Sequence, residues 1–365
     1  MNSHPSVVIF GTSISSAYLS GCTILFRALT DAFVRLGWQV KFVEEQHAWL
    51  ELRSDYHVAS PLIQVLCYGD RPSLVKLLND PGLFDDVQLV LKFSGSSYQH
   101  DRHIDEWLAD AKCSNRLNAV IVYVDADAPM RLPYIIRHPH FYLHKVLCYF
   151  DGVWVMLGGR RAIEEYRMIG AQRVWFMPAA VDPQAFQPMP SIAEYAADLL
   201  FIGNPAYGRT SQLKRLFFDV AEQCPANRFL LAGAEWGSAC LPRNVHYLGY
   251  VPSNHLPQLY SSARLILNIT REEMAVYGHA GALRLFEAAS CGGCIVTDMW
   301  SGIDTLFGAG KEILVAENTA DIVGYVENVD WQLSKTIGNL ARARVFRDHT
   351  PDHRIRSLLK ILNLN

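Results

Sequence analysis

The sequence predicts an α/β protein of two doubly wound, Rossmann-like domains that face a cleft. Its 365 residues suffice for two or more domains of about 150 residues each. In both halves, short β-branched segments alternate with amphipathic segments of helical period, which is typical of parallel sheets covered by helices. A proline-rich segment separates the halves. We expect an N-terminal domain over 1–185, a C-terminal domain over 191–345, and a last helix over 346–365 that can cross back to the first domain.

The first half contains six expected strands. They span Ser6–Gly11, Trp38–Val43, Gln88–Phe93, Ala119–Val124, Gly152–Leu157 and Arg173–Met177. Helix-like segments lie between them, and the clearest is Cys22–Leu36. There Leu25, Leu29 and Leu36 belong to an apolar set at helical spacing, and Gly37 ends the segment. This half is therefore expected to form one doubly wound domain.

The segment Pro178–Pro190 holds four prolines and no periodicity, which predicts an ordered linker. The alternation then begins again. The expected strands are Asp198–Gly203, Arg228–Gly233, Val245–Tyr250, Arg264–Ile269, Cys294–Asp298 and Ile313–Ala316. The last segment, Leu333–Leu362, has a helical pattern that Pro351 interrupts.

The amino-acid composition limits the kinds of partner that we expect the protein to bind. Half of the residues are hydrophobic, 19% are charged and the formal net charge is -3, a balance that indicates a folded protein without a general polyanion-binding surface. Nucleic acid is therefore not an expected partner. No apolar stretch approaches the roughly 20 residues of a transmembrane helix, and Met1–Pro5 lacks the basic start of a secretory signal. We expect a cytoplasmic protein; peripheral membrane contact and the oligomeric state stay open.

The segment Asn268–Asp298 combines a strand, a glycine-bearing loop, a helix expected over 280–290 and a second strand. Arg284 and Glu287 lie one turn apart on that helix. A guanidinium can hold a diphosphate and a carboxylate can accept hydrogen bonds from ribose hydroxyls, while the helix start favours an anion. The same spacing also fits a surface ion pair, which leaves two interpretations of these residues.

This segment resembles the C-terminal domain of the CgeB-like glycosyltransferases, which are relatives of the family 4 enzymes with the GT-B fold. The resemblance extends over most of the second half and is weaker in the first. In the second half the resemblance also rests on Asp198–Gly203 with Arg209, Arg228–Gly233, Asn244–Tyr250, Leu259–Arg264 and Asp348–Thr350 with Arg354. In the first half it rests on Asp151–Trp154, Gly170–Val174 and Pro178–Pro183.

The resemblance implies that the second domain binds a nucleotide-diphosphate sugar and the first domain an acceptor. Glu287 matches the glutamate that binds the donor ribose, and Arg209 and Lys214 match an Arg-x4-Lys pair directed at the diphosphate. Fixed cations and a helix start would stabilise the leaving group, so neither a metal nor another cofactor is expected. Tyr250 is a candidate for stacking on the base, with core packing as the alternative.

His279 stands where family 4 enzymes usually carry a second glutamate, eight residues before Glu287. This departure bears on recognition of the sugar ring and on the stereochemical course. A histidine there can hydrogen-bond a sugar hydroxyl or a phosphate, and it can equally be an ordinary loop residue. We include His279 among the candidate catalytic residues.

Candidate bases follow two strands of the first half. Asp125 and Asp127 form a D-x-D sequence, which binds a metal in another glycosyltransferase fold; here one of them is a candidate to deprotonate the acceptor, and an Asx turn is the alternative. Another strand is followed by His100, Asp101 and His103. One of these residues can serve as the base, or the two histidines can be ordinary solvated loop residues.

The sequence therefore predicts a metal-independent glycosyltransferase that acts on a nucleotide sugar and an unidentified acceptor. Two alternatives stay open: a nucleotide-sugar epimerase of the same architecture, and a noncatalytic protein that binds nucleotides or carbohydrates.

Overall fold

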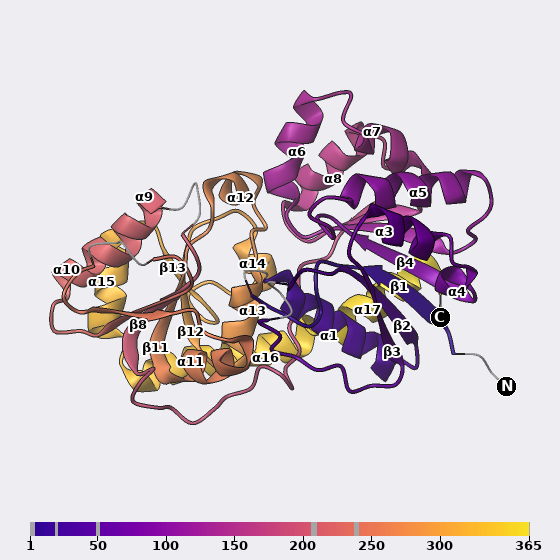
Figure 1. Cartoon of the computed structure of the whole chain (residues 1–365). Helices are drawn as coiled ribbons and strands as arrows, with labels where there is room; N and C mark the ends of the chain where they lie inside the picture. Colours follow the sequence, from indigo (N-terminus) through magenta and orange to yellow (C-terminus); the bar gives the residue numbers. More distant parts are fainter. Residues whose placement is uncertain (1–3, 19–20, 49–51, 206–209, 237–240, 365) are drawn as a thin grey trace. The chain divides into compact units, whose positions relative to one another are not determined.

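A computed structural model of the chain describes residues 4–18, 21–48, 52–205, 210–236 and 241–364. The chain forms two compact units (Figure 1). Unit 1 comprises residues 1–178 and 351–365, and unit 2 comprises residues 179–350. The division therefore falls at the start of the proline-rich segment and again at Pro351.

Unit 1 is built on a seven-stranded parallel sheet in the order β3-β2-β1-β4-β5-β6-β7. Its strands are β1 Ser6–Phe10, β2 Gln39–Glu45, β3 Ile63–Tyr68, β4 Val87–Phe93, β5 Val120–Asp125, β6 Gly152–Val155 and β7 Val174–Phe176. Six of these overlap the expected strands, whereas β3 was not expected. Among the described strands β3 pairs only with β2, so it is an edge strand, and it is buried mainly at its two ends.

Helices connect the strands of unit 1. They include α1 Cys22–Arg35, α3 Arg71–Leu78, α4 Pro81–Phe84, α5 Asp101–Cys113, α6 Ala128–Arg137, α7 Leu143–Val146 and α8 Gly159–Met168. The last helix, α17 Pro351–Leu362, packs on α1 within this unit. Arg35 and Asp352 form an ion pair at 2.7 Å between these two helices, and Arg354 Nε donates to the carbonyl oxygen of Pro178 at 2.6 Å.

Unit 2 has a six-stranded parallel sheet in the order β10-β9-β8-β11-β12-β13. Its strands are β8 Ala197–Ile202, β9 Phe229–Ala232, β10 Val245–Gly249, β11 Ala263–Asn268, β12 Cys294–Asp298 and β13 Leu314–Ala316, and all six overlap the expected strands. Strand order reverses between β8 and β11, because the chain runs outward from β8 through β9 to β10 and then returns to β11. In a doubly wound sheet, ligands bind outside the carboxyl ends of the strands at this reversal.

Helices surround the sheet of unit 2. They are α9 Thr210–Leu213, a π-helical turn at Lys214–Phe218, α10 Asp219–Gln223, α11 Leu256–Ser262, α12 Glu272–Tyr277, α13 Leu283–Ser290, α14 Ile303–Leu306, α15 Thr319–Asn328 and α16 Trp331–Asp348. Helix α10 packs on α15, whereas α13 packs on α11 and α16. Leu265 and Leu267 of β11 join the same hydrophobic cluster as Val220 of α10 and Ile322 of α15. Alternate side chains of a strand point to opposite faces, so Asn268 lies on the face of α13.

Helix α13 begins at Leu283, three residues later than expected. Gly278 and His279 both have positive φ, and Ala282 is extended, so the chain turns sharply before the helix starts. A Cβ on Gly278 would stand 2.8 Å from the carbonyl oxygen of Ser301, so only glycine fits this turn. Arg284 therefore occupies the second residue of the helix.

Within the described residues, no helix combines the length and the apolar character needed to cross a membrane.

Candidate functional site

The start of α13 lies beside the point where strand order reverses in unit 2. Ala282 precedes the helix without a side-chain cap, and the first turn contains no acidic residue. Within the described chain, the N–H groups of Leu283 and Arg284 donate to no acceptor. Because the amino end of a helix carries partial positive charge, these groups favour an anionic ligand.

Glu287 is the buried carboxylate of this site. Glu287 is 5% exposed, and its Oε2 accepts a hydrogen bond of 2.9 Å from the hydroxyl of Tyr260 on α11. Burial raises the pKa of Glu287 to about 7, although the hydrogen bond from Tyr260 and the charge of Arg284 act in the opposite direction. A carboxylate held in this way can exchange a proton near neutral pH and can accept hydrogen bonds from hydroxyl groups.

Arg284 lies one turn earlier on the same helix. Its Nη1 donates to Asn268 Oδ1 over 3.3 Å, and its guanidinium carbon lies 5.6 Å from the centre of the Phe201 ring. Asn268 ends β11, and Phe201 lies on β8, so the guanidinium joins the two strands on either side of the reversal. Burial lowers the pKa of Arg284, while Tyr260 and Glu287 raise it. The structure therefore places the partly buried Arg284 beside the buried Glu287 in one cluster.

Hydroxyl and carboxylate groups support this cluster from β11 and β12. Asn268 Nδ2 donates to Thr297 Oγ1 at 3.0 Å, which leaves its oxygen directed at Arg284. Asp298 Oδ1 accepts the backbone N–H of Thr270 at 2.9 Å, and burial raises the pKa of Asp298 to about 6. The bond to Thr297 orients the Asn268 amide and thereby helps to position the guanidinium.

His279 is half-buried in the turn that precedes α13. Its φ is 47°, and its backbone N–H donates to the carbonyl oxygen of Ser301 at 2.6 Å. The imidazole ring lies against Gly302, where a Cβ would come within 2.6 Å of it. Burial lowers the pKa of His279, which favours a neutral imidazole. Its role toward a ligand stays a prediction.

The remaining donor-side candidates lie elsewhere in unit 2. Lys214 is on an exposed surface, with its side chain 72% exposed and its Nζ 2.6 Å from Asp219 Oδ1. Tyr250 follows the edge strand β10 and is 37% exposed, so it is not a core residue. Among the described residues, neither side chain has a hydrogen bond or ion pair with Arg284 or Glu287. Arg209 lies outside the described residues, and all three assignments stay predictions.

The two acceptor-side aspartates differ in their surroundings. Asp125 is fully buried: its Oδ1 accepts Ser94 Oγ at 2.8 Å and the backbone N–H of Asp127 at 2.9 Å, and its Oδ2 accepts the hydroxyl of Tyr166. The Asx turn that the sequence left open is therefore formed. Asp127 is exposed at the start of α6. Of the two, Asp127 is the side chain that can meet an acceptor from solvent.

Tyr260 is a site residue that the sequence did not predict. It occurs in a segment that resembles the family, but 27 residues separate it from Glu287. Such a contact depends on how α11 packs against α13 and has no local pattern. Asn268 begins the segment Asn268–Asp298, but its spacing to Arg284 does not indicate the hydrogen bond between them.

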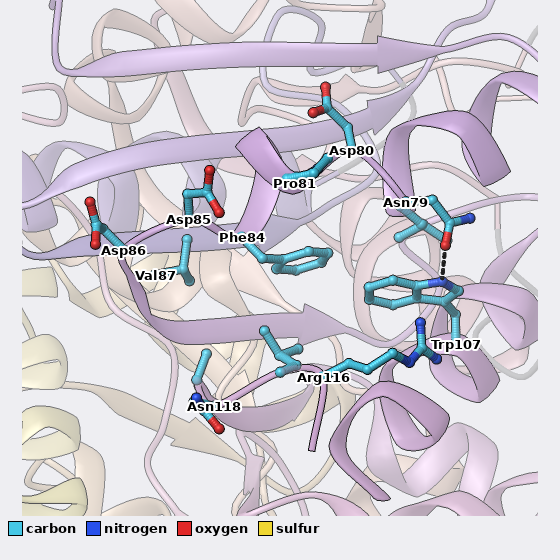
Figure 2. Close-up of a pocket in the computed structure, with 13 residues that line it drawn as sticks. Asn79, Asp80, Pro81, Phe84, Asp85, Asp86, Val87, Trp107, Arg116 and Asn118 are labelled. Carbon is cyan, nitrogen blue, oxygen red and sulfur yellow. Dashed lines mark hydrogen bonds between the residues drawn. The ribbon is translucent and has the colours of Figure 1, made fainter. Parts of the chain in front are cut away.

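A cavity of about 580 Å³ opens in unit 1 (Figure 2). Its lining includes Val87 and Ala119, which stand at the amino ends of β4 and β5. Phe84 and Trp107 stack beside it with ring centres 5.1 Å apart. None of the predicted site residues lines this cavity, and it lies at the opposite edge of the sheet from the carboxyl ends where such residues occur.

A family model matches part of the second half of the chain. Residues 209–360 match a family model described as glycosyl transferase-like. This glycosyltransferase-like region contains Tyr260, Asn268, Arg284 and Glu287, so it includes the whole cluster described above. A search of curated proteins gives no significant match.

Solved structures resemble the whole chain in fold. Sucrose-phosphate synthase from Thermosynechococcus elongatus has a TM-score of 0.70 at 14% identity, over 99% of both chains. Anabaena HepE in complex with UDP and glucose has the same score and identity, over 98% of this chain and 100% of that one. An alpha-glucosyltransferase in complex with UDP and DNA has a TM-score of 0.69 at 13% identity, over 99% and 100%. The expected fold class is thus confirmed: two parallel Rossmann-like sheets, as in GT-B glycosyltransferases.

Proposed function

We propose that the protein is a CgeB-like glycosyltransferase that takes a sugar from a nucleotide-diphosphate donor bound to unit 2. The observation that carries this proposal is the buried Glu287, held by Tyr260 one turn from Arg284 at the start of α13. A ribose offers two neighbouring hydroxyl groups, and a fixed carboxylate is a strong acceptor for both. The match of residues 209–360 to the glycosyl transferase-like model supports the same assignment.

The diphosphate would lie against the Arg284 guanidinium and the backbone N–H groups of Leu283 and Arg284, which donate to no acceptor among the described residues. When the bond from the sugar to the diphosphate breaks, negative charge develops on the leaving oxygen. A guanidinium and a helix start are positioned before the reaction and can stabilise this charge. We infer that these groups replace a metal ion in this step. Arg209 and Lys214 remain proposed as further cations for the diphosphate.

UDP-glucose is a suitable first donor, because HepE has been crystallised with UDP-glucose. The experiment is incubation of the purified protein with UDP-glucose, followed by NMR of all products, with and without candidate acceptors. Transfer gives UDP and a glycosylated acceptor, and slow hydrolysis gives UDP and glucose. Addition of a chelator should leave the rate unchanged.

The same experiment separates the alternatives. An epimerase would yield an isomeric nucleotide sugar without any acceptor. A noncatalytic protein would bind UDP-glucose and leave it intact with every acceptor. Either of these results would overturn the proposed function.

A further inference from the structure

Two consecutive glutamates at the end of β2 anchor the loops of unit 1. Successive side chains of a strand point to opposite faces, and Glu44 and Glu45 accordingly bind different loops. Glu44 Oε2 accepts the backbone N–H of Ile14, in the loop after β1, at 2.6 Å. Glu45 Oε2 accepts Ser97 Oγ at 2.7 Å and the backbone N–H of Tyr98 at 2.8 Å, in the loop after β4. Strand order reverses between β1 and β4, so these loops border the expected ligand position in this sheet.

Glu45 keeps one oxygen available in this arrangement. Its side chain is 3% exposed, and both hydrogen bonds named above fall on Oε2. Among the described residues Oε1 accepts no hydrogen bond. Two imidazoles flank the carboxylate: His100 Nε2 lies 3.9 Å from Oε1, and His47 Nε2 lies 3.5 Å from Oε2. A buried carboxylate with an unused oxygen favours a ligand that supplies hydrogen-bond donors.

An exposed aromatic ring adjoins these polar groups. Tyr98 is 56% exposed although its backbone N–H is bound to Glu45, and its ring meets that of His47 edge-to-face with centres 5.0 Å apart. Tyrosine combines an apolar face with a polar tip, and this suits a ligand with an apolar face and polar edges. A sugar ring has C–H groups on its faces and hydroxyl groups around its edge. The four side chains therefore match the two kinds of surface that a sugar presents.

We propose that Glu45, His47, Tyr98 and His100 bind a neutral carbohydrate as the acceptor of the reaction. Glu45 Oε1 accepts a sugar hydroxyl, the imidazole of His100 hydrogen-bonds a further hydroxyl, and the ring of Tyr98, which meets His47 edge-to-face, covers one sugar face. The carboxylate disfavours a phosphorylated or other anionic acceptor. Within the described residues, no group of three acidic, histidine or cysteine side chains is placed to hold a metal ion, so a cation is not the expected ligand of this cluster. This inference rests on the proposed function, because it names the class of acceptor that the transferase would use.

The test is saturation-transfer NMR with the methyl α-glycosides of glucose, galactose and mannose, on the full chain in the presence of UDP. The wild-type protein should transfer saturation to at least one glycoside. Glu45→Gln keeps an oxygen that can accept from Ser97 and Tyr98. This variant and Tyr98→Ala should each weaken binding of that glycoside by about tenfold or more. Tyr134→Ala is the matched control, because Tyr134 is a similarly exposed tyrosine of unit 1, at 53%, and should leave binding unchanged.

A parallel titration with UDP keeps the two proposals separate. UDP binding that is equal in wild type, Glu45→Gln and Tyr98→Ala shows that the variants are folded and that the donor site is intact. If UDP binds but no glycoside receives saturation, or if the variants bind the glycoside as well as wild type, the acceptor proposal is wrong. If UDP does not bind to wild type, the proposed function itself fails.

Discussion

The hydroxyl of Tyr260 donates a 2.9 Å hydrogen bond to Glu287 Oε2 and thereby fixes a buried carboxylate at the carboxyl edge of the unit 2 sheet. The bond connects α11 to α13, and Arg284 lies one turn before Glu287 on α13. Since the carboxylate is oriented before any ligand arrives, little side-chain freedom is lost on binding. The cluster is consequently prepared for a ligand with hydroxyl groups next to an anionic group.

Arg284→Ala should weaken UDP binding by about 1.5 to 3 kcal/mol, the usual value of a hydrogen bond to a charged group. Uridine lacks the diphosphate, so its binding should change much less. Competition titrations with UDP and uridine measure both effects. Arg243→Ala removes an exposed arginine of the same unit and serves as the control. An equal loss for UDP and uridine would show that Arg284 acts on the fold and does not contact the diphosphate.

The raised pKa of Glu287 predicts a pH-dependent stability. The unfolded carboxyl ionises near 4.5, whereas the folded one ionises near 7, so between these values the folded state holds the extra proton. The free energy of unfolding of wild type therefore falls as pH rises through this window and levels off above it. Glu287→Gln lacks this titration.

The stability of Glu287→Gln relative to wild type should thus increase by roughly 2 to 3 kcal/mol from pH 5 to pH 8. Urea unfolding at both pH values measures the difference. Glu327→Gln, on the exposed surface of α15, should show no such change. A difference for Glu287→Gln that stays constant with pH would exclude a raised pKa in the folded protein.

Gly338 lets α16 approach the turn between α13 and β12. A Cβ at this position would stand 2.1 Å from the carbonyl oxygen of Gly292, which is backbone and cannot move aside easily. Gly338→Ala should therefore destabilise the protein by about 1 to 3 kcal/mol. Gly324→Ala is a matched helical control, because a Cβ there meets nothing within 4 Å and should stabilise by up to about 1 kcal/mol. Thermal unfolding of the two variants should give opposite shifts, and similar shifts would contradict the packing described.

Asp125 and Asp127 should respond differently to the same substitution. Asparagine cannot accept all the bonds that Asp125 accepts, so Asp125→Asn should cost about 2 kcal/mol of stability. Asp127→Asn should change stability by less than about 0.5 kcal/mol. If Asp127 is the base, its loss should slow transfer by about 100-fold or more. A normal rate for Asp127→Asn would remove it from the reaction.

Much of the fold follows from the local pattern of the sequence. Buried parallel strands such as β5 and β11 are continuous apolar segments, and their ends were predicted within one or two residues. The edge strand β3 was not predicted; its sequence is largely apolar, but in the structure only its two end residues are buried. The start of α13 was placed too early, since the positive φ of His279 is unusual for a residue other than glycine.

The candidate site could be predicted only in part. Arg284 and Glu287 share one helix, so their proximity follows from spacing, and the structure adds that Glu287 is buried and Arg284 partly buried. The contact of Tyr260 with Glu287 and the position of Glu45 between His47 and His100 join segments that are distant in sequence. Spacing carries no information about such contacts.

The central claim is that the ribose of a nucleotide binds to Glu287 on unit 2. Calorimetric titration of UDP into wild type and Glu287→Ala tests it most directly. The account predicts that wild type binds UDP and that the variant, still folded, loses about 1.5 to 3 kcal/mol of binding free energy. Equal affinity of UDP for the two proteins would contradict it.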